Sequence, residues 1–528
     1  MGRGDPSSAP GPGVGLHCGV GFPPARVGDG AYSAPVHEDF DRCYRAVQSK
    51  DARFDGWFVI AVLTTKIYCR PSCPARPPYA RNMRFLPTAA AAQQAGFRAC
   101  KRCRPDASPG SPEWNMRRDV VARAMRLIAD GTVDREGVTG LASRLGYSTR
   151  QLERQLVAEV GTGPLAIARA QRAQTARLLI ETTGLAFAAI AFASGFSSVR
   201  QFNDTVRLVF DATPTSLRAR AKRSATPATP GALTFRLPFR TPFSPESLFG
   251  HLMATAVPGC EEFRNGAYRR TLRLPAGSST VALTPTPDYV SCQLVLDDIR
   301  DLPTAIARCR RLLDLDADPE AVVAAFDADT ALGPLVGKSA GRRIPGAVDE
   351  IELAVRIVLG QQVSTAAART HAGRLVARCG VPITDPGGGL THLFPSLDDL
   401  AVIDPATLGL PKARQRCFAE LVTALASGTV NIGVGADWEL ARGQLATIPG
   451  IGEWSIEMIA MRALGDPDAF PATDMGVRKG AASLGLPESP AGLVDHAQRW
   501  RPWRAYATQY LWGALDHPIN QWPPKGPS

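Results

Sequence analysis

The chain has 528 residues and a formal net charge of +11. Apolar residues make up 45% of it and charged residues 21%, which is ordinary globular usage and excludes a chain that is disordered throughout. The length predicts three or more domains. No apolar run approaches a membrane span, so no membrane partner is expected. The excess of basic residues favours a polyanionic partner.

The N-terminal stretch is rich in Gly, Pro and Ser and lacks the compact apolar run of a signal peptide. We therefore predict a disordered tail over 1–35 and a cytoplasmic protein. A second short tail is predicted over 521–528.

Four of the eleven cysteines form two close pairs, Cys69 with Cys73 and Cys100 with Cys103. Two chelating turns joined by a short loop predict one tetrahedral zinc ion held by four thiolates. Residues 61–104 also contain nine Lys or Arg and no acidic residue. A zinc-bound thiolate is deprotonated at neutral pH and is therefore nucleophilic. The residues alone leave open a closed structural site and a reactive site beside a DNA phosphate.

A family resemblance favours the reactive site. Residues 36–108 resemble the methylphosphotriester-repair domain of Ada-type adaptive-response proteins, through Thr64-Thr65-x-x-x-Cys69-Arg70-Pro71-Ser72-Cys73 and Gly96-Phe97-Arg98-x-Cys100-Lys101-Arg102-Cys103. The resemblance implies that Cys69 is both a zinc ligand and the irreversible acceptor of a methyl group from a methylated phosphate. It also implies that Thr65, Arg76 and Arg98 contact DNA. Without it, both arginines would be interpreted as solvated surface charges.

A helical segment with an internal repeat is predicted over 115–222. Ala142-x-x-Leu145-Gly146-Tyr147-Ser148 recurs 49 residues later as Ala191-x-x-Ser194-Gly195-Phe196-Ser197. A small residue, a Gly and a polar start to the next helix are typical of a helix-turn-helix. Two such units in tandem resemble the DNA-binding half of AraC-type activators, which implies promoter DNA and RNA polymerase as partners. The expected recognition helices lie around 148–156 and 197–206.

After a linker predicted over 223–232, the sequence changes character. Alternating apolar and polar residues predict an antiparallel sheet, in the stretches Thr234–Leu237, Tyr268–Leu274, Thr280–Thr284 and Val290–Leu296. Helical patterns follow at Pro303–Leu313 and from Val348 onward.

The run Ile448-Pro449-Gly450-Ile451-Gly452-x-Trp454 is typical of a helix-hairpin-helix, whose exposed amides can hold a DNA phosphate without reading sequence. Asp474 follows twenty residues after Trp454. By itself, Asp474 would be interpreted as a helix cap.

Residues 233–517 as a whole resemble AlkA-type 3-methyladenine DNA glycosylase II, with supporting matches at Leu359-Gly360-Gln361-Gln362-Val363-Ser364 and Pro411-Lys412-Ala413-Arg414. The resemblance implies that Asp474 is the catalytic carboxylate. It also implies that Trp454 and Trp512 line the pocket of a flipped base, that Gly450 and Gly452 hold DNA, and that Gln362 is the wedge that fills the gap. Because Trp454 replaces the Schiff-base lysine of bifunctional relatives, we expect a monofunctional enzyme.

Three departures from the family pattern bear on substrate range. Met458 and Met475 stand where such enzymes often carry tyrosines. His251 stands where an aromatic ring from the sheet domain would contribute. Gln362 is polar at a usually apolar position.

We therefore predict a multidomain α+β protein that joins an adaptive response to DNA alkylation with base excision on double-stranded DNA. Its expected parts are a small α/β zinc domain, an all-α tandem helix-turn-helix, an antiparallel-sheet domain and an all-α glycosylase domain, over 36–110, 115–222, 233–345 and 346–520. The alternative is a zinc-stabilised transcriptional regulator whose glycosylase half is catalytically degenerate.

Overall fold

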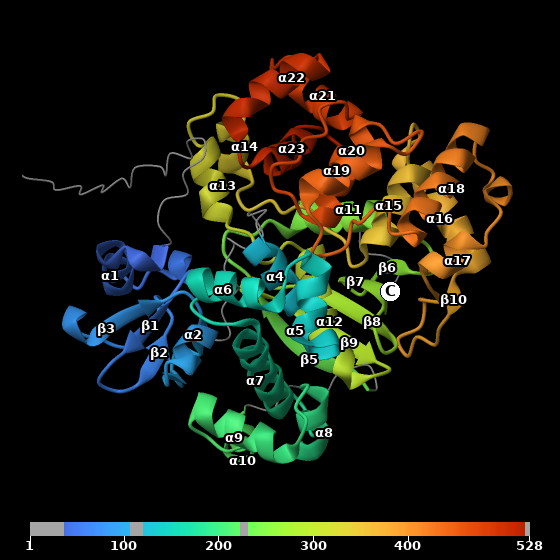
Figure 1. Cartoon of the computed structure of the whole chain (residues 1–528). Helices are drawn as coiled ribbons and strands as arrows, with labels where there is room; N and C mark the ends of the chain where they lie inside the picture. Colours follow the sequence, from blue (N-terminus) through green and yellow to red (C-terminus); the bar gives the residue numbers. More distant parts are fainter. Residues whose placement is uncertain (1–35, 106–119, 222–230, 523–528) are drawn as a thin grey trace, which may run out of the picture. The chain divides into compact units, whose positions relative to one another are not determined.

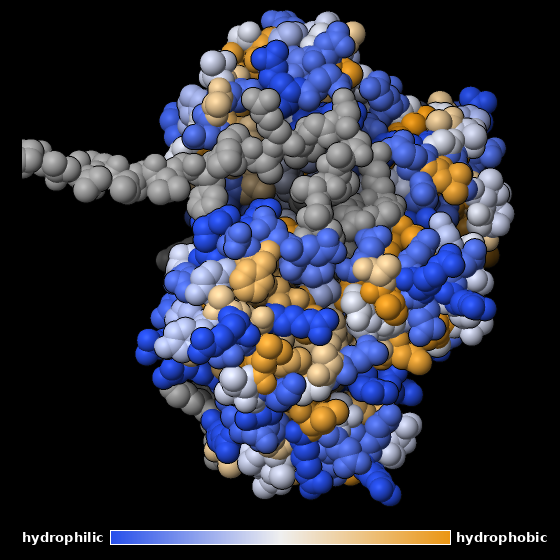
Figure 2. Space-filling model, turned by 60° about the vertical axis from the view of Figure 1, so that its left-hand side comes forward, coloured by the Kyte–Doolittle hydropathy of each residue, from blue (hydrophilic) through white to orange (hydrophobic). Residues whose placement is uncertain are grey.

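The computed structural model describes residues 36–105, 120–221 and 231–522 (Figure 1). The tail predicted over 1–35, nearly all of the linker and residues 523–528 of the second tail lie outside the described residues. None of the helices in the described segments is long and apolar enough to cross a membrane. On the face shown in Figure 2, apolar side chains are scattered among polar ones, as on an ordinary water-exposed surface.

The first segment is a small α/β domain built on a four-stranded sheet of order β3-β1-β2-β4. Its strands are β1 (Val59–Val62), β2 (Ile67–Cys69), β3 (Met83–Leu86) and β4 (Arg98–Ala99), and its α-helices are α1 (Phe40–Gln48) and α2 (Ala89–Gln94). Neighbouring strands are antiparallel except β2 and β4, which run parallel. Parallel pairing makes β2 and β4 end at the same edge, where their following residues meet.

The second segment is all helical, as predicted. Its helices are α4 (Val120–Ala129), α5 (Thr132–Leu145), α6 (Thr149–Val160), α7 (Pro164–Thr182), α8 (Phe187–Ala193), α9 (Val199–Phe210) and α10 (Pro214–Arg220). The two copies of the repeat fall on α5–α6 and α8–α9. Each turn passes through a left-handed glycine, Gly146 at φ 77° and Gly195 at φ 81°, a conformation that glycine adopts without steric cost.

The recognition helices are longer than the sequence suggested. Ser148 caps α6 by accepting a hydrogen bond from the Gln151 amide, whereas Ser198, not Ser197, caps α9 through the Gln201 amide. Each helix runs four residues beyond its expected end, to Val160 and to Phe210.

The third segment opens with a five-stranded antiparallel sheet of order β5-β9-β8-β7-β6. Its strands are β5 (Leu233–Pro238), β6 (Glu261–Arg264), β7 (Ala267–Arg273), β8 (Ser278–Pro285) and β9 (Tyr289–Leu296), with helices α11 (Pro245–Ala254) and α12 (Leu302–Leu312). Four strands match the alternating stretches of the sequence. The sequence analysis did not predict β6, a short strand of mostly charged residues.

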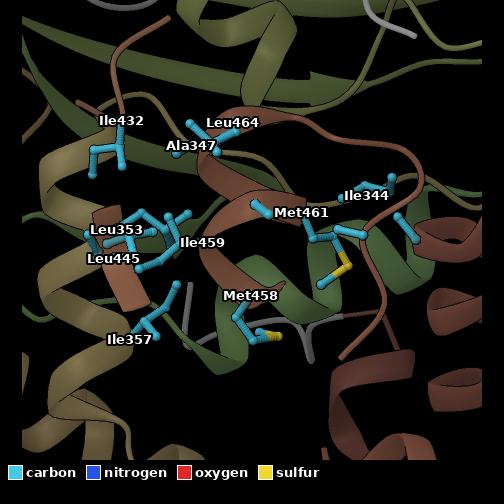
Figure 3. Packing of buried hydrophobic residues seen from close by; sticks show 14 of the residues in the cluster. Ile344, Ala347, Leu353, Ile357, Ile432, Leu445, Met458, Ile459, Met461 and Leu464 are labelled. Carbon is cyan, nitrogen blue, oxygen red and sulfur yellow. The ribbon is translucent and has the colours of Figure 1, made fainter. Parts of the chain in front are cut away.

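The rest of the third segment is largely helical, as expected. Its helices are α13 (Pro319–Phe326), α14 (Gly333–Lys338), α15 (Glu350–Leu359), α16 (Thr365–Cys379), α17 (Leu397–Ala401), α18 (Lys412–Ala426), α19 (Trp438–Ala446), α20 (Glu453–Ile459), α21 (Met475–Ser483), α22 (Pro490–His496) and α23 (Arg504–Gly513). Its core contains Leu353 and Ile357 of α15, Leu445 of α19, and Met458 and Ile459 of α20 (Figure 3). Burial of these side chains fixes α19 and α20 against α15.

Candidate active sites

The parallel pairing of β2 with β4 brings the two cysteine pairs together. Cys69 ends β2 and Cys100 directly follows β4, while Cys73 and Cys103 return from the loops beyond. The four Sγ atoms all lie within 4.8 Å of one another. A regular tetrahedron with Zn–S bonds of about 2.3 Å separates its sulfur atoms by about 3.8 Å. Four soft thiolate donors at this spacing fit zinc, so zinc is the cofactor of this site.

A buried carboxylate shapes the loop between Cys69 and Cys73. Asp55 accepts hydrogen bonds from the Ser72 amide at 3.0 Å and from the Ser72 hydroxyl at 2.6 Å, and its carboxylate lies 3.3 Å from the Arg70 guanidinium. Burial raises the pKa of Asp55, while these partners oppose the shift. No role for Asp55 is predicted from the sequence.

Cys69 differs from the other three cysteines in its exposure. Cys73, Cys100 and Cys103 are buried, whereas Cys69 is half-buried. The side chain most open to an approaching group is thus the expected acceptor. Thr65 lies exposed in the turn between β1 and β2.

The other two expected DNA contacts lie in the same small domain. Arg76 is exposed in the loop after Cys73, and Arg98 is half-buried on β4. All three expected contacts therefore reach solvent to some degree.

Asp474 lies between two tryptophans. Trp454 Nε1 donates a hydrogen bond to one carboxylate oxygen and Trp512 Nε1 to the other, both at 2.9 Å. The Val477 amide also donates to Asp474 at 2.9 Å, so this side chain caps α21. The helix-cap interpretation is confirmed, and the same side chain is the one that the resemblance implies to be the catalytic carboxylate. Two indole donors hold the half-buried carboxylate in one orientation.

The helix-hairpin-helix forms as predicted, from α19, the turn through Gly450, and α20. Gly450 has φ 90° and Gly452 is the N-cap of α20. Both glycines are exposed, so their backbone amides are open to a phosphate. Gln362 is also exposed, at φ 54° in the turn between α15 and α16.

Three of the four residues that depart from the family pattern, Met458, Met475 and His251, occupy different environments. Met458 is buried in the core and Met475 is 68% exposed. His251 is buried, and its ring stacks on Trp512 with centroids 6.0 Å apart. Burial, with the charges of Arg462 and Arg356, holds the pKa of His251 well below its usual range. His251 is therefore a neutral ring near neutral pH.

Comparison with known proteins places these sites in families. Residues 42–106 match the metal binding domain of Ada, residues 141–220 a helix-turn-helix domain, and residues 234–349 the AlkA N-terminal domain. A Mycobacterium tuberculosis protein described as a probable bifunctional transcriptional activator/DNA repair enzyme AlkA is 68% identical over 493 residues, covering 93% of this chain and 99% of that protein. The chain belongs to this AlkA family of bifunctional transcriptional activator/DNA repair enzymes.

Other relatives match only part of the chain. The Escherichia coli DNA-3-methyladenine glycosylase 2 is 31% identical over 53% of this chain and 96% of its own length. The Salmonella typhimurium regulatory protein ada is 39% identical over 26% of this chain and 37% of its own length. A 3-methyladenine DNA-glycosylase from Archaeoglobus fulgidus has a similar structure, with a TM-score of 0.46 and 21% identity, over 53% of this chain and 97% of that one.

Proposed function

We propose that this protein both senses and repairs alkylated DNA: it takes a methyl group from a DNA methylphosphotriester onto Cys69, activates transcription in the methylated form, and excises alkylated bases such as 3-methyladenine at Asp474. The observation that carries the excision activity is the Asp474 carboxylate held between the indoles of Trp454 and Trp512. A clamp that only gripped DNA would need the helix cap that Asp474 provides, but not two indole donors fixing the same carboxylate.

Methyl transfer is a direct substitution at Cys69. When bound, zinc supplies the positive charge that keeps the four thiols deprotonated. Cys69 Sγ forms a bond to the methyl carbon, and the bond from that carbon to the phosphate oxygen breaks. The leaving group is an ordinary phosphodiester anion, and the product is a thioether that no group of this site can reverse. Each chain therefore acts once.

Base excision breaks an N-glycosidic bond. As that bond breaks, positive charge builds on the sugar, and the fixed Asp474 carboxylate stabilises it and orients the attacking water. An alkylated purine is already cationic and leaves readily, so little acid catalysis is needed. The faces of Trp454 and Trp512 would attract the cationic base. Trp454, where bifunctional relatives carry a lysine, is consistent with simple hydrolysis.

Both halves need contacts with double-stranded DNA. Thr65, Arg76 and Arg98 would hold DNA beside Cys69, and the amides of Gly450 and Gly452 would hold a phosphate near the lesion. Gln362 would fill the gap left by the flipped base.

The regulatory role rests on the tandem helix-turn-helix. The preference for particular DNA sequences would come from the exposed N-terminal turns of α6 and α9. RNA polymerase is the proposed partner at promoters. The compartment would be the cytoplasm, where a bacterial chromosome lies. The competing function is a regulator with an inactive glycosylase half.

One preparation tests the whole proposal. The purified protein is incubated with methylated duplex DNA, the released bases are separated by chromatography, and the peptides are mapped by mass. We expect free 3-methyladenine and one added methyl group, on Cys69. Methyl transfer without base release would favour the competing function. A methyl group on Cys103, or none, would reject Cys69 as the acceptor.

A further inference from the structure

The expected wedge residue has a strained backbone that some neighbour must hold. Gln362 lies between α15 and α16 with φ 54°, in the left-handed region that costs a non-glycine residue about 1 kcal/mol or more. Its side chain is exposed, so packing of that side chain does not hold the turn. The restraint must come from the adjoining residues.

Gln361, the preceding residue, supplies that restraint. Its side-chain Nε2 donates hydrogen bonds to the Gly450 carbonyl and to the Ser455 hydroxyl, both at 3.0 Å. Its backbone carbonyl accepts a hydrogen bond from the Arg414 guanidinium. Ser455 is 2% exposed and Arg414 is 9% exposed, so the bonds to these two residues are partly shielded from water, while the bond to the Gly450 carbonyl lies at the surface. The shielded bonds fix geometry more strongly, because breaking one leaves a polar group unsatisfied.

The turn through Gly450, to which Gln361 hydrogen bonds, is also held in place. A side-chain Cβ at Gly450 would lie 3.0 Å from Cys417 Cβ and 3.2 Å from Cys417 Sγ, so the hairpin backbone packs directly on α18. Gln361 thus joins the wedge turn to the hairpin through its side-chain amide and to Arg414 of α18 through its backbone carbonyl.

We propose that Gln361 is a positioning residue that locks the wedge Gln362 to the phosphate-binding hairpin, so that the two grip duplex DNA at a fixed spacing. This rests on the proposed glycosylase function. A wedge can push a base out of the stack only if the protein is anchored to the backbone nearby. Gln361 provides that anchor, because the two hydrogen bonds that its side chain donates end on Gly450 and Ser455 of the helix-hairpin-helix.

The chemistry of an amide suits this role. Gln361 offers an N–H₂ group to two oxygen acceptors. A methionine has the same length and no donors, and a glutamate would place negative charge against the Gly450 carbonyl. Gln361→Met therefore removes the tie with little change in volume, while Ser455→Ala removes one of its two bonds.

The test compares excision from methylated DNA as a duplex and as single strands, in single-turnover reactions of the full-length protein. A single strand has no stack to open and no gap to fill, so it needs no wedge. We expect Gln361→Met to slow duplex excision about tenfold and Ser455→Ala about threefold. Excision from single strands should change less than about twofold. The fluorescence of 2-aminopurine placed beside the lesion should report less base opening in both variants.

A matched control variant and the substrate dependence distinguish the possible outcomes. Gln498→Met, an exchange of an exposed glutamine in the 3₁₀-helix Ala497–Trp500, should behave as the wild type on both substrates. Equal losses on duplex and single-stranded DNA, or no loss, would overturn the positioning role. Wild-type protein that releases no base would instead reject the proposed glycosylase. If Gln361→Met does not fold, the duplex-to-single-strand ratio of Ser455→Ala decides.

Discussion

Asp474 caps α21 and is also the proposed catalytic carboxylate, and a single substitution can separate the two roles. Asparagine caps helices as well as aspartate does, so Asp474→Asn should keep α21 in place. It removes the negative charge that the sugar cation needs. We expect release of 3-methyladenine to fall at least about 100-fold, measured as free base from methylated duplex DNA.

Methyl transfer provides the control for that variant. Cys69 belongs to the small zinc domain and Asp474 to the helical part of the third segment, so methylation of Cys69 by the same DNA should be unchanged in Asp474→Asn. Retained excision would show that Asp474 acts only as a helix cap. Loss of both activities would point to a global folding defect.

The carboxylate of Asp314 should make the stability of the glycosylase half depend on pH. Burial raises the pKa of Asp314 from 3.8 to about 6, against the opposing effect of Arg343; Tyr506 donates to it at 2.8 Å. The unfolded chain loses this proton near pH 3.8 and the folded chain keeps it until about pH 6. The free energy of unfolding should therefore fall as the pH rises between these values, by as much as about 3 kcal/mol.

Asp314→Asn should remove that part of the pH dependence. Asparagine tolerates the left-handed backbone found there, at φ 48°. Six of the eight tryptophans lie after residue 430, so tryptophan fluorescence in urea reports mainly on this half. Equal changes of the urea midpoint between pH 4 and 7 in both proteins would contradict the assignment to Asp314.

At the scale of elements, the hairpin that should hold a DNA phosphate depends on Gly450. Alanine there would meet both a φ of 90° and contact with Cys417 at 3.0 Å. We expect Gly450→Ala to destabilise this half by about 1–2 kcal/mol and to weaken binding of undamaged duplex DNA. Thermal unfolding and a DNA titration measure the two effects.

A double variant tests the steric cause. Cys417→Ala removes Sγ, which would lie 3.2 Å from a Cβ at residue 450, but keeps its own Cβ at 3.0 Å. It therefore relieves only part of the steric penalty, and the backbone strain at residue 450 remains. Gly450→Ala combined with Cys417→Ala should recover only part of the lost DNA affinity. Full recovery would mean that the contact with Sγ is the main cause and that the left-handed backbone is unimportant there.

Sequence patterns predicted the elements whose periodicity is visible. Strands β7, β8 and β9 alternate apolar and polar residues, and both helix-turn-helix units show their glycine turns. Strand β6 was missed because its first residue, Glu261, is a buried acid paired with Arg270 and Arg356. Because ion-pair partners that are distant in the chain cannot be recognised from the sequence, a buried charged residue cannot be distinguished there from an exposed one.

The same limit applies to the sites. Spacing predicted the cysteine cluster because each chelating pair is local in the chain. The roles of Asp55 and Gln361 depend on contacts with residues 17 and about 90 positions away, so neither role could be predicted from the sequence, although Gln361 lies in a run that matches the AlkA-type family. The resemblance supplied Asp474, and only the structure showed that both tryptophans hydrogen bond to it.

At the scale of the whole molecule, the question is how repair at Cys69 could control a helix-turn-helix elsewhere in the chain. Charge offers a mechanism that needs no change of shape. Four thiolates around Zn²⁺ carry a formal charge of −2, and conversion of one thiolate to a thioether leaves −1. The nine basic residues between 61 and 104 favour a zinc site that faces DNA, where that loss removes repulsion from phosphates.

The size of this effect can be estimated. At about 8 Å and an effective dielectric constant of about 40, Coulomb's law gives roughly 1 kcal/mol per phosphate before salt screening. Two or three phosphates would strengthen binding roughly tenfold to a hundredfold. Because the gain involves phosphates alone, it should apply to any DNA sequence, while the preference for promoter DNA set by α6 and α9 should stay the same.

Titrations of promoter DNA and of an unrelated duplex of equal length, with methylated and unmethylated protein at several salt concentrations, test this mechanism. Methylation should tighten binding to both duplexes by a similar factor, and the gain should shrink as salt rises. Protein incubated with unmethylated DNA is the control and should show no gain. A gain confined to promoter DNA would indicate a rearrangement of the helix-turn-helix rather than a change of charge. Equal affinities before and after methylation at low salt would leave Cys69 without any control over the DNA-binding helices.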